Sequence, residues 1–408
     1  MQDLDAEPSV SIRINPRRLS ADKEPEGADG RVPWCPEGIY LSGRPVFTAD
    51  PLFHAGVYYV QEASSMFVAH VLRMIGESSI SVALDLCAAP GGKSTLLRSL
   101  LPDDSLLVSN EPVRARTQVL AENMAKWGHD NVVVTQAQAA DFAALCESGG
   151  KLKRLGDRRF DLILADVPCA GEGMMRKDED ARRQWSQRLI ASCAAQQREI
   201  VNDVWPALRP GGWLVYSTCT FNPEEDEKNV EWIARELGAD IIPIPVQPEW
   251  NLFQPHLSNP IHQSSFINPH SSIHFCHFLP GRVRGEGFFL SVLRKHGQTD
   301  DKPRIDVESY KKLLRERLQT LPADLLDRIP GVTSPIPRID LSLEEAIRYL
   351  QHESLVLPPD APQGYVQVSF LGQRLGFVKN LGSRANNLYP KEWRIRSGYV
   401  VPHTIWPL

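Results

Sequence analysis

Two cysteines, Cys169 and Cys219, stand where this chain could support sulfur chemistry. Each follows a short apolar run that predicts a buried parallel strand, 160–165 before Cys169 and 213–216 before Cys219. Open α/β sheets bind ligands beyond the carboxyl ends of their strands, so we expect both thiols at that edge. With the glycine-rich turn 87–93 upstream, they indicate sulfur chemistry beside a nucleotide-like cofactor.

The turn 87–93 reads Cys-Ala-Ala-Pro-Gly-Gly-Lys and separates a predicted strand from a predicted helix. A P-loop also ends in Gly-Lys-Ser but needs glycine where Cys87 stands, and the dinucleotide pattern GxGxxG is absent. The turn offers close backbone approach to a ligand at a helix N-terminus. Glu111 follows about 20 residues later, where an acidic side chain can accept ribose hydroxyls. These features favour S-adenosylmethionine over a dinucleotide; the alternative is a plain turn with Glu111 on the surface.

The elements that position these residues alternate between strand and helix from 79 to 240. Predicted strands lie at 82–86, 106–109, 132–134, 160–165 and 213–216, and predicted helices at about 93–101, 113–126, 185–208 and 224–237. The helix at 185–208 is expected to end at the breaker cluster 209–212, and 287–294 predicts a last strand of the same sheet. Repeated strand–helix units predict an α/β fold with a doubly wound, mostly parallel sheet.

The segments on either side are expected to form appended parts, because 408 residues exceed one ordinary core. Residues 11–15, 364–370 and 374–378 predict strands, and residues 62–74, 310–321 and 343–350 predict helices. We expect an N-terminal element at 1–78, the α/β domain at 79–297, a linker and helical subdomain at 298–355, and a C-terminal domain at 356–408.

Composition excludes several classes of protein. The chain is 42% hydrophobic and 23% charged, which is typical of globular proteins. Its apolar runs are much shorter than the ~20 residues of a membrane helix. The acidic N-terminus lacks the features of a secretory signal. The seven cysteines include no CxxC pair, which indicates reduced thiols, so a soluble cytoplasmic protein is expected.

Basic residues gather in the C-terminal segment, although the net charge of the chain is −5. From residue 361 onward, Glu392 is the single acidic residue beside six basic ones: Arg374, Lys379, Arg384, Lys391, Arg394 and Arg396. This excess indicates a phosphate-facing module, with an ordinary solvated surface as the alternative.

Three motifs in order, at 84–94, 166–173 and 216–220, resemble the Sun-type RNA cytosine-C5 methyltransferases, and most closely the bacterial RsmF group acting on 16S rRNA. The resemblance runs from about residue 11 to 294, and 375–391 is similar to the C-terminal PUA-like RNA-binding domain of that group. It implies a Rossmann-like class I methyltransferase domain with a seven-stranded sheet. A short N-terminal RNA-binding element and a C-terminal α+β PUA-like domain are implied as well.

The resemblance also implies the site residues. It places contacts to S-adenosylmethionine on Cys87, Ala88, Ala89, Pro90, Gly91, Gly92, Lys93, Glu111 and Asp166. Gln138 stands where relatives often carry an acidic residue at the adenine end, and its amide could still form a hydrogen bond there. Cys219 becomes the nucleophile that adds to C6 of cytosine, and Cys169 the cysteine needed for product release. Asp166 is expected to act as the acid near N3 of the ring.

Each assignment has an alternative. Cys169 could itself be the nucleophile, because DNA cytosine-C5 methyltransferases use a Pro-Cys at the equivalent strand end. Those enzymes continue with Gln-x-x-Ser, whereas this chain continues with Ala-Gly-Glu-Gly, which favours Cys219. Cys219 could instead be a buried strand-end thiol, and Asp166 could merely cap its loop.

The expected partner is RNA, namely 16S rRNA or the small ribosomal subunit, with tRNA as the nearest rival substrate. The target cytosine must be flipped out or already unpaired to enter a deep pocket. A non-catalytic RNA-binding or assembly factor on the same scaffold is an alternative of another class. We expect a monomer with no membrane or metal partner.

Basic and aromatic side chains could hold this RNA. Near the site these are Arg176, Lys177, Arg182 and Arg183, with a solvated helix face as the alternative. In the C-terminal segment they include Tyr389, Trp393 and Tyr399. The histidines at 256, 262, 270, 274 and 277, with Cys276, match no zinc spacing and are expected near RNA or in solvent.

Overall fold

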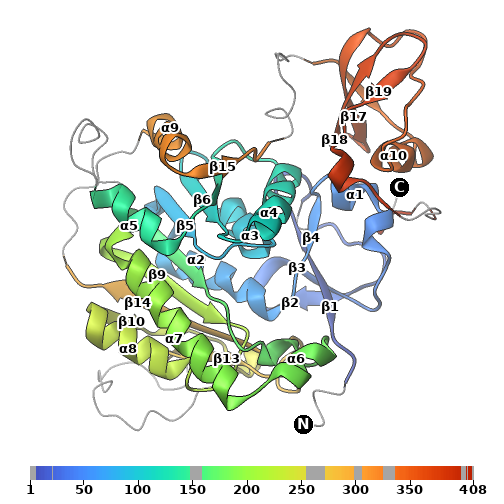
Figure 1. Cartoon of the computed structure of the whole chain (residues 1–408). Helices are drawn as coiled ribbons and strands as arrows, with labels where there is room; N and C mark the ends of the chain where they lie inside the picture. Colours follow the sequence, from blue (N-terminus) through green and yellow to red (C-terminus); the bar gives the residue numbers. More distant parts are fainter. Residues whose placement is uncertain are drawn as a thin grey trace.

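The computed structural model describes residues 6–20, 22–147, 159–253, 272–297, 306–324, 336–396, 401 and 403–406. These residues form a nine-stranded central sheet and two four-stranded sheets, one from the N-terminal and one from the C-terminal part of the chain. Figure 1 shows the N-terminal strands, in blue, between the central sheet and the C-terminal strands, in orange and red. In the part of the chain that is described, no helix is both long and apolar enough to cross a membrane.

The central sheet confirms the predicted doubly wound architecture. Its strands run in the order β10 (Ala239–Ile242), β14 (Phe288–Lys295), β9 (Leu208–Thr218), β8 (Phe160–Asp166), β5 (Val82–Asp85), β6 (Leu106–Asn110), β7 (Val132–Gln136) and β15 (Gln319–Leu321), with β13 (Cys276–Phe278) paired to β14. Strands β9, β8, β5, β6 and β7 are parallel to one another, whereas β14 is antiparallel to β9 and β15 is antiparallel to β7. The seven strands from β10 to β7 are the expected methyltransferase sheet, and β15 and β13 extend it.

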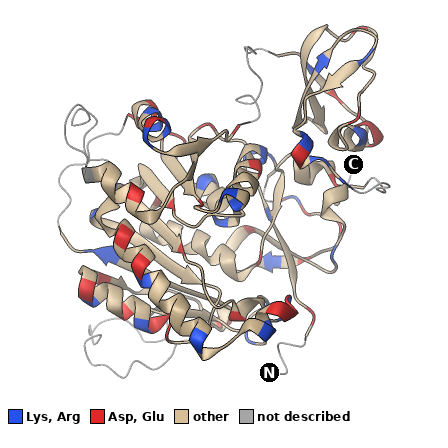
Figure 2. Cartoon of the chain, in the orientation of Figure 1, with Lys and Arg blue, Asp and Glu red and all other residues tan. Residues whose placement is uncertain are grey.

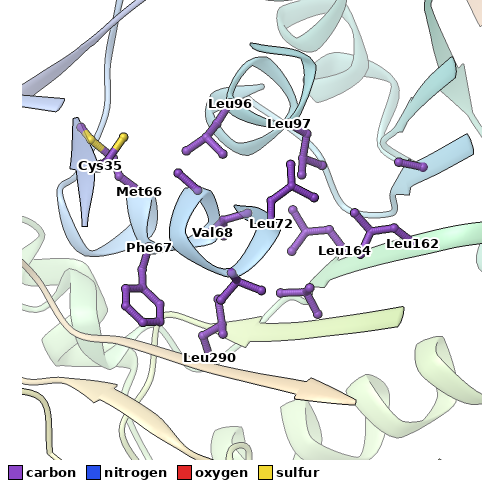
Figure 3. Close-up of a cluster of buried hydrophobic side chains, with 14 of the residues drawn as sticks. Cys35, Met66, Phe67, Val68, Leu72, Leu96, Leu97, Leu162, Leu164 and Leu290 are labelled. Carbon is purple, nitrogen blue, oxygen red and sulfur yellow. The ribbon is translucent and has the colours of Figure 1, made fainter. Parts of the chain in front are cut away.

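Alternate side chains of the central strands face two different hydrophobic cores, as the period of a strand requires. On one face the sheet packs against α2 (Val68–Ile75), α3 (Gly92–Leu100) and α4 (Arg114–Trp127). On the other face it packs against α5 (Ala139–Glu147), α7 (Gln187–Val204), α8 (Glu227–Leu237) and α9 (Val307–Arg317). Figure 3 shows the first core, where Val68 and Leu72 of α2 lie between Leu96 of α3 and Leu290 of the sheet.

Several predicted boundaries were wrong because of contacts that local patterns do not reveal. The predicted helix at 185–208 is α7, which the Ser186 side chain caps and which ends at Val204 before a 3-10 turn at 205–207. A separate short helix, α6 (Glu179–Gln184), precedes it. The breaker cluster 209–212 lies inside β9, where a register shift against β8 accommodates it. The predicted helix at 310–321 ends at Arg317, since 319–321 pair with the edge strand β7.

The N-terminal residues form more than the short element expected. Strands β2 (Ala28–Val32), β3 (Cys35–Leu41), β1 (Val10–Ile14) and β4 (Tyr58–Val60) make one sheet. In the chain, α1 (Pro51–His54) lies between β3 and β4, and α2 follows β4. The predicted helix at 62–74 begins as a 3-10 turn, η3 (Ser64–Phe67), before α2. From β1 the buried Arg13 side chain reaches α3, where Nη2 donates to Thr95 Oγ1 at 2.6 Å. The N-terminal sheet therefore braces the helix that follows the glycine turn.

The C-terminal residues form the expected α+β unit. Strands β16 (Arg338–Asp340), β17 (Gly364–Phe370), β18 (Gln373–Asn380) and β19 (Ala385–Asn387) form its sheet, and α10 (Leu343–Leu350) packs on it. The core of this unit continues into the N-terminal sheet, because the same cluster contains Ile12 and Tyr58 beside Tyr349 and Phe377. The remaining elements are the strand pair β11 (Ile244–Pro245) and β12 (Ser272–Ile273), and the 3-10 turns at 47–49, 77–79, 172–174, 205–207, 248–250 and 391–393.

Candidate active site

A cavity of about 430 Å³ lies at the carboxyl ends of β5, β8 and β9. This is the edge at which ligands of open α/β sheets bind. The cavity joins the glycine turn to Asp166 and Cys219, as the sequence motifs predicted. Its lining is Tyr59, Val60, Gln61, Glu62, Ser65, Asp85, Cys87, Ala88, Ala89, Pro90, Gly92, Lys93, Asp166, Gly173, Met174, Lys177, Cys219, Glu286, Gly287 and Phe288.

The two cysteines meet because their strands are neighbours in register. Asp166 at the end of β8 pairs with Ser217 of β9, and the chain then leads to Cys169 and Cys219 respectively. Their sulfur atoms are 3.0 Å apart. The hydrogen bond to Cys219, together with burial, raises the pKa of Cys169 well above its usual range. Cys169 is therefore held as a thiol beside the Cys219 sulfur.

The loops that carry the cysteines are fastened to each other through their backbones. The N–H of Gly173 donates to the carbonyl oxygen of Cys219 at 2.7 Å. The N–H of Ala170 donates to Glu225 Oε2 at 3.0 Å. Gly173 also lies against Gly287, so close that a Cβ on Gly173 would stand 2.1 Å from the Gly287 oxygen. Only glycine fits this contact.

Asp166 joins the cofactor turn to the cysteine loops. Its Oδ2 accepts a hydrogen bond from Lys93 Nζ at 2.8 Å, and its Oδ1 accepts one from Ser217 Oγ at 2.8 Å. Burial disfavours the charge on Lys93, but the Asp166 carboxylate outweighs burial and raises the Lys93 pKa. The site thus holds an ammonium–carboxylate pair next to the nucleophile candidate.

The glycine turn ends in the N-terminus of α3. Gly91 is the residue before the helix and has φ +116°, a conformation that a residue with a side chain rarely adopts. The Ala89–Pro90 peptide bond is cis. The first amides of α3 therefore face the cavity without an intervening side chain at Gly91 or Gly92, which suits a closely bound ligand.

Two buried carboxyl groups have an oxygen without a hydrogen bond from the described residues, and they test whether S-adenosylmethionine fits. Glu111 is 1% exposed, and its Oε2 forms no hydrogen bond, although Arg116 Nη1 lies 3.4 Å away. Asp85 Oδ1 is also unpaired, while its Oδ2 accepts a hydrogen bond from Ser94. Burial raises the pKa of Asp85 to about 7. Ribose hydroxyls and a cationic sulfonium or ammonium group are suitable partners for such oxygens, so the residues fit the cofactor.

Glu111, a predicted cofactor contact, does not line the cavity, and neither does Gln138. Gln138 follows β7, its side chain is exposed, and its backbone N–H donates to Asp141 Oδ2 at 2.8 Å. Of the predicted turn, Gly91 is also absent from the lining, while the other six residues contribute to it.

Motif reasoning missed the part of the wall that comes from outside the α/β units. Tyr59 and Gln61 come from the N-terminal sheet and the segment after it, and Glu286 and Phe288 from the start of β14. No motif marks these residues. Asp85 had a detectable signal, since it is an acidic residue inside an apolar strand.

The basic residues after Cys169 have partners within the protein. Arg176 is nearly buried and donates to Glu286 Oε2 at 2.8 Å, and Lys177 Nζ lies 3.2 Å from Glu286 Oε1. Lys177 also lines a neighbouring groove of about 810 Å³ that extends over the N-terminal sheet. Arg183 pairs with Glu179 on its own helix. Lys177 is therefore the member of this group that lines both hollows.

Two expectations for exposed side chains were wrong. Tyr389 and Trp393 are buried in the core of the C-terminal unit, so they offer no ring for stacking on a base. His277 is also buried, and its Nε2 lies 2.8 Å from Glu227 Oε1, with Asp226 nearby in a group of three possible metal ligands. Tyr399 and the histidines at 256, 262 and 270 lie outside the described residues.

Three family models match consecutive parts of the chain. The model described as 16S rRNA methyltransferase RsmB/F matches residues 74–294. The N-terminal domain of 16S rRNA methyltransferase RsmF matches residues 1–63, and the methyltransferase RsmF PUA domain matches residues 336–395. These matches confirm the resemblance expected from the motifs.

Named relatives and solved structures agree with the family models. Ribosomal RNA small subunit methyltransferase F of Cronobacter sakazakii is 34% identical over 392 residues, which cover 92% of this chain and 74% of the relative. The protein of that name from Escherichia coli K12 is 33% identical, covering 86% of this chain and 69% of its own. A methyltransferase homologue from Pyrococcus horikoshii is 25% identical, with a TM-score of 0.54 over 72% of this chain and 88% of that one. NSun6 from the same organism, solved with SFG, supports the fold with a TM-score of 0.52 at 23% identity, over 73% of this chain and 93% of its own.

Proposed function

The chain belongs to the RsmB/F family of 16S rRNA methyltransferases, and from this premise we propose that it forms 5-methylcytosine in small-subunit rRNA. It is an S-adenosylmethionine-dependent methyltransferase. The observation that carries the proposal is the pair of thiols 3.0 Å apart, one of which lines the cavity of the glycine turn. A methyltransferase acting on oxygen or an exocyclic nitrogen needs no such pair, whereas C5 of cytosine must first be activated.

Activation begins with covalent attack. The Cys219 thiolate forms a bond to C6, and the electron pair of the C5–C6 double bond moves into the ring toward N3. The proton that neutralises this charge comes from the Lys93–Asp166 pair, and Asp166 faces the ring nitrogen. C5 then has the character of an enamine carbon and can attack a methyl group.

S-adenosylmethionine supplies the electrophilic methyl group at this site. We assign its contacts to the turn from Cys87 to Lys93, to Glu111 and to Asp166, and the unpaired oxygen of Glu111 supports a ribose hydroxyl there. We also propose that the exposed Gln138 contacts the adenine end of the cofactor.

Release completes the cycle. The proton on C5 passes to water and the proton on N3 returns to the Lys93–Asp166 pair, while the C5–H electron pair re-forms the C5–C6 double bond and expels Cys219 as a thiolate. Cys169, held as a thiol at 3.0 Å, is positioned to assist when the Cys219 sulfur departs. Cys219 lines the cavity of the glycine turn and Cys169 does not, which supports attack by Cys219 and the helper role for Cys169.

The target base has to enter the cavity from the RNA. We propose that it is flipped out or unpaired, and that the groove beside Lys177 continues the path of the strand. The C-terminal unit is proposed as an RNA-binding module, and the protein as a cytoplasmic monomer. The pairing of β15 with β7 and of β16 with β17 supports dividing the segment 298–355 between the methyltransferase and C-terminal domains.

The function is tested by supplying purified protein and S-adenosylmethionine to naked 16S rRNA, to assembled small subunits and to tRNA, followed by bisulfite sequencing of each. We expect a new 5-methylcytosine in the ribosomal substrates. Methylation of tRNA alone would replace the substrate, and no methylation of any RNA would favour the non-catalytic alternative.

A further inference from the structure

The turn that presents Cys219 is anchored by a single carboxyl group. Thr218 and Thr220, on either side of the cysteine, both direct their hydroxyls to Asp226 Oδ1, at 2.7 and 3.0 Å. The two hydroxyl oxygens are 2.7 Å apart, and Thr218 Oγ1 also accepts the backbone N–H of Thr220 at 3.2 Å. Both hydroxyl groups and the acid are fully buried.

The surroundings of Asp226 favour the uncharged acid. Burial raises its pKa well above the usual range, and the neighbouring Glu227 and Glu225 add to this effect. Asp226 Oδ2 forms no hydrogen bond with the described residues, and neither does Glu227 Oε2. A proton on Oδ2 removes the cost of an isolated buried charge and gives this oxygen a hydrogen to donate. Glu227 has His277 as its own partner, at 2.8 Å.

We propose that Asp226 is a positioning residue for Cys219: its Oδ1 holds the hydroxyls of Thr218 and Thr220 and so fixes the direction of the thiol between them. The inference rests on the proposed function, because it assigns a role relative to the nucleophile. A hydroxyl bound on each side restricts the backbone of the turn, and a small displacement of a nucleophile lowers the rate steeply.

The experiment compares three variants in single-turnover methylation of the small subunit. Asp226→Ala removes the acceptor and is expected to lower the rate about 10- to 100-fold, with unchanged affinity for S-adenosylmethionine. Asp226→Asn keeps an acceptor oxygen in place and is expected to recover most of the rate. The double variant Thr218→Val, Thr220→Val keeps Asp226 but removes both hydroxyls, and its rate should fall as in Asp226→Ala. The exposed Asp240→Asn serves as the control.

Rescue by Asp226→Asn separates positioning from a general structural role, because this variant keeps the acceptor oxygen for both hydroxyls. A wild-type rate in Asp226→Ala would overturn the inference, as would a loss of activity in Asp226→Asn, which a metal ligand at this position would cause. A wild-type protein that methylates no RNA would instead refute the underlying function.

Discussion

The sulfur atoms of Cys169 and Cys219 are 3.0 Å apart, so the state of each thiol depends on the other. With its pKa raised, Cys169 keeps its proton and can donate it toward the Cys219 sulfur. A thiolate on Cys219 is stabilised by such a donor, and also by the nearby Lys93 ammonium group, whose own pKa is raised in part by Cys219. The two cysteines are thus chemically unequal although their strands place them side by side.

Substituting each cysteine should therefore produce different results. Cys219→Ala removes the attacking sulfur, and methylation is expected to fall by at least about 1000-fold without any covalent enzyme–RNA product. In the Cys169→Ala variant, Cys219 should still attack the base, but the product should be released slowly. A covalent enzyme–RNA adduct should therefore survive denaturing gel electrophoresis. The opposite pattern would exchange the two roles. Cys35→Ala, in the N-terminal sheet, is the control and should show neither effect.

A substitution can also distinguish a catalytic role of Asp166 from the role of a residue that only caps its loop. Asp166→Asn keeps an acceptor for Ser217 but loses the charge that pairs with Lys93. We expect the single-turnover rate to fall by about 10²- to 10⁴-fold, the usual contribution of a positioned acid or base. A rate within twofold of the wild type would mean that Asp166 only shapes the loop.

At the scale of elements, three segments far apart in the chain meet at Cys219. The loop after β8, the turn after β9 and the start of β14 converge where Gly173 lies between the Cys219 carbonyl and Gly287. The N-terminal strand β1 adds a brace, because Arg13 bonds to Gln61 on one side and to Thr95 of α3 on the other. The cysteine pair is therefore held by backbone packing, and the cofactor helix by a different domain.

The contact between Gly173 and Gly287 predicts how a side chain at position 173 would affect the loop that carries Cys169. Gly173→Ala introduces a Cβ only 2.1 Å from the Gly287 oxygen and 2.9 Å from the Cys219 oxygen, so the loops must separate. We expect a loss of about 1 to 3 kcal/mol in the free energy of unfolding, as for other overpacked sites. Methylation should fall more than this loss of stability explains.

Denaturant unfolding and single-turnover rates measure both effects. Gly43→Ala is the matched control, since nothing lies within 4 Å of a Cβ built there. Equal effects of the two substitutions would contradict a tightly packed cysteine loop.

At the scale of the whole molecule, the C-terminal unit differs from the catalytic region in its distribution of charge. Figure 2 shows basic and acidic residues, in blue and red, mixed along the helices of the central domain. In the C-terminal unit, Lys379, Arg384, Lys391, Arg394 and Arg396 are exposed. The unit nevertheless shares its core with the N-terminal sheet, and Ile405 bonds to Asp50 through its backbone N–H. The C-terminal unit is thus packed against the rest of the protein, and its exposed basic side chains can contact a polyanion.

If these cations contact RNA phosphates, their removal should change the salt dependence of binding. The triple variant Arg384→Gln, Lys391→Gln, Arg394→Gln is expected to reduce the slope of log K against log salt by about 2 to 3, since each phosphate contact contributes about 0.7 to 0.9. Filter binding to 16S rRNA at several salt concentrations measures this slope. Lys228→Gln, Arg235→Gln, Arg348→Gln removes three exposed cations that already have carboxylate partners, and its slope should match the wild type.

The sequence by itself determined the architecture and the type of chemistry. Alternating apolar segments predicted the central strands, because the periodicity of a strand or helix is set by near neighbours in the chain. The same locality made the glycine turn and both cysteine motifs recognisable. Where a boundary depended on a partner strand, as at 209–212 inside β9 and at 319–321 beside β7, local patterns gave the wrong element.

Only the tertiary structure decided how the site is assembled. The contact between the two sulfurs, the Lys93–Asp166 pair and the walls from Tyr59 and Glu286 join residues that are far apart in the chain. Burial excluded two predicted RNA contacts, since Tyr389 and Trp393 lie in the core of the C-terminal unit. Such contacts arise from the packing of whole elements against each other, which no short stretch of sequence contains.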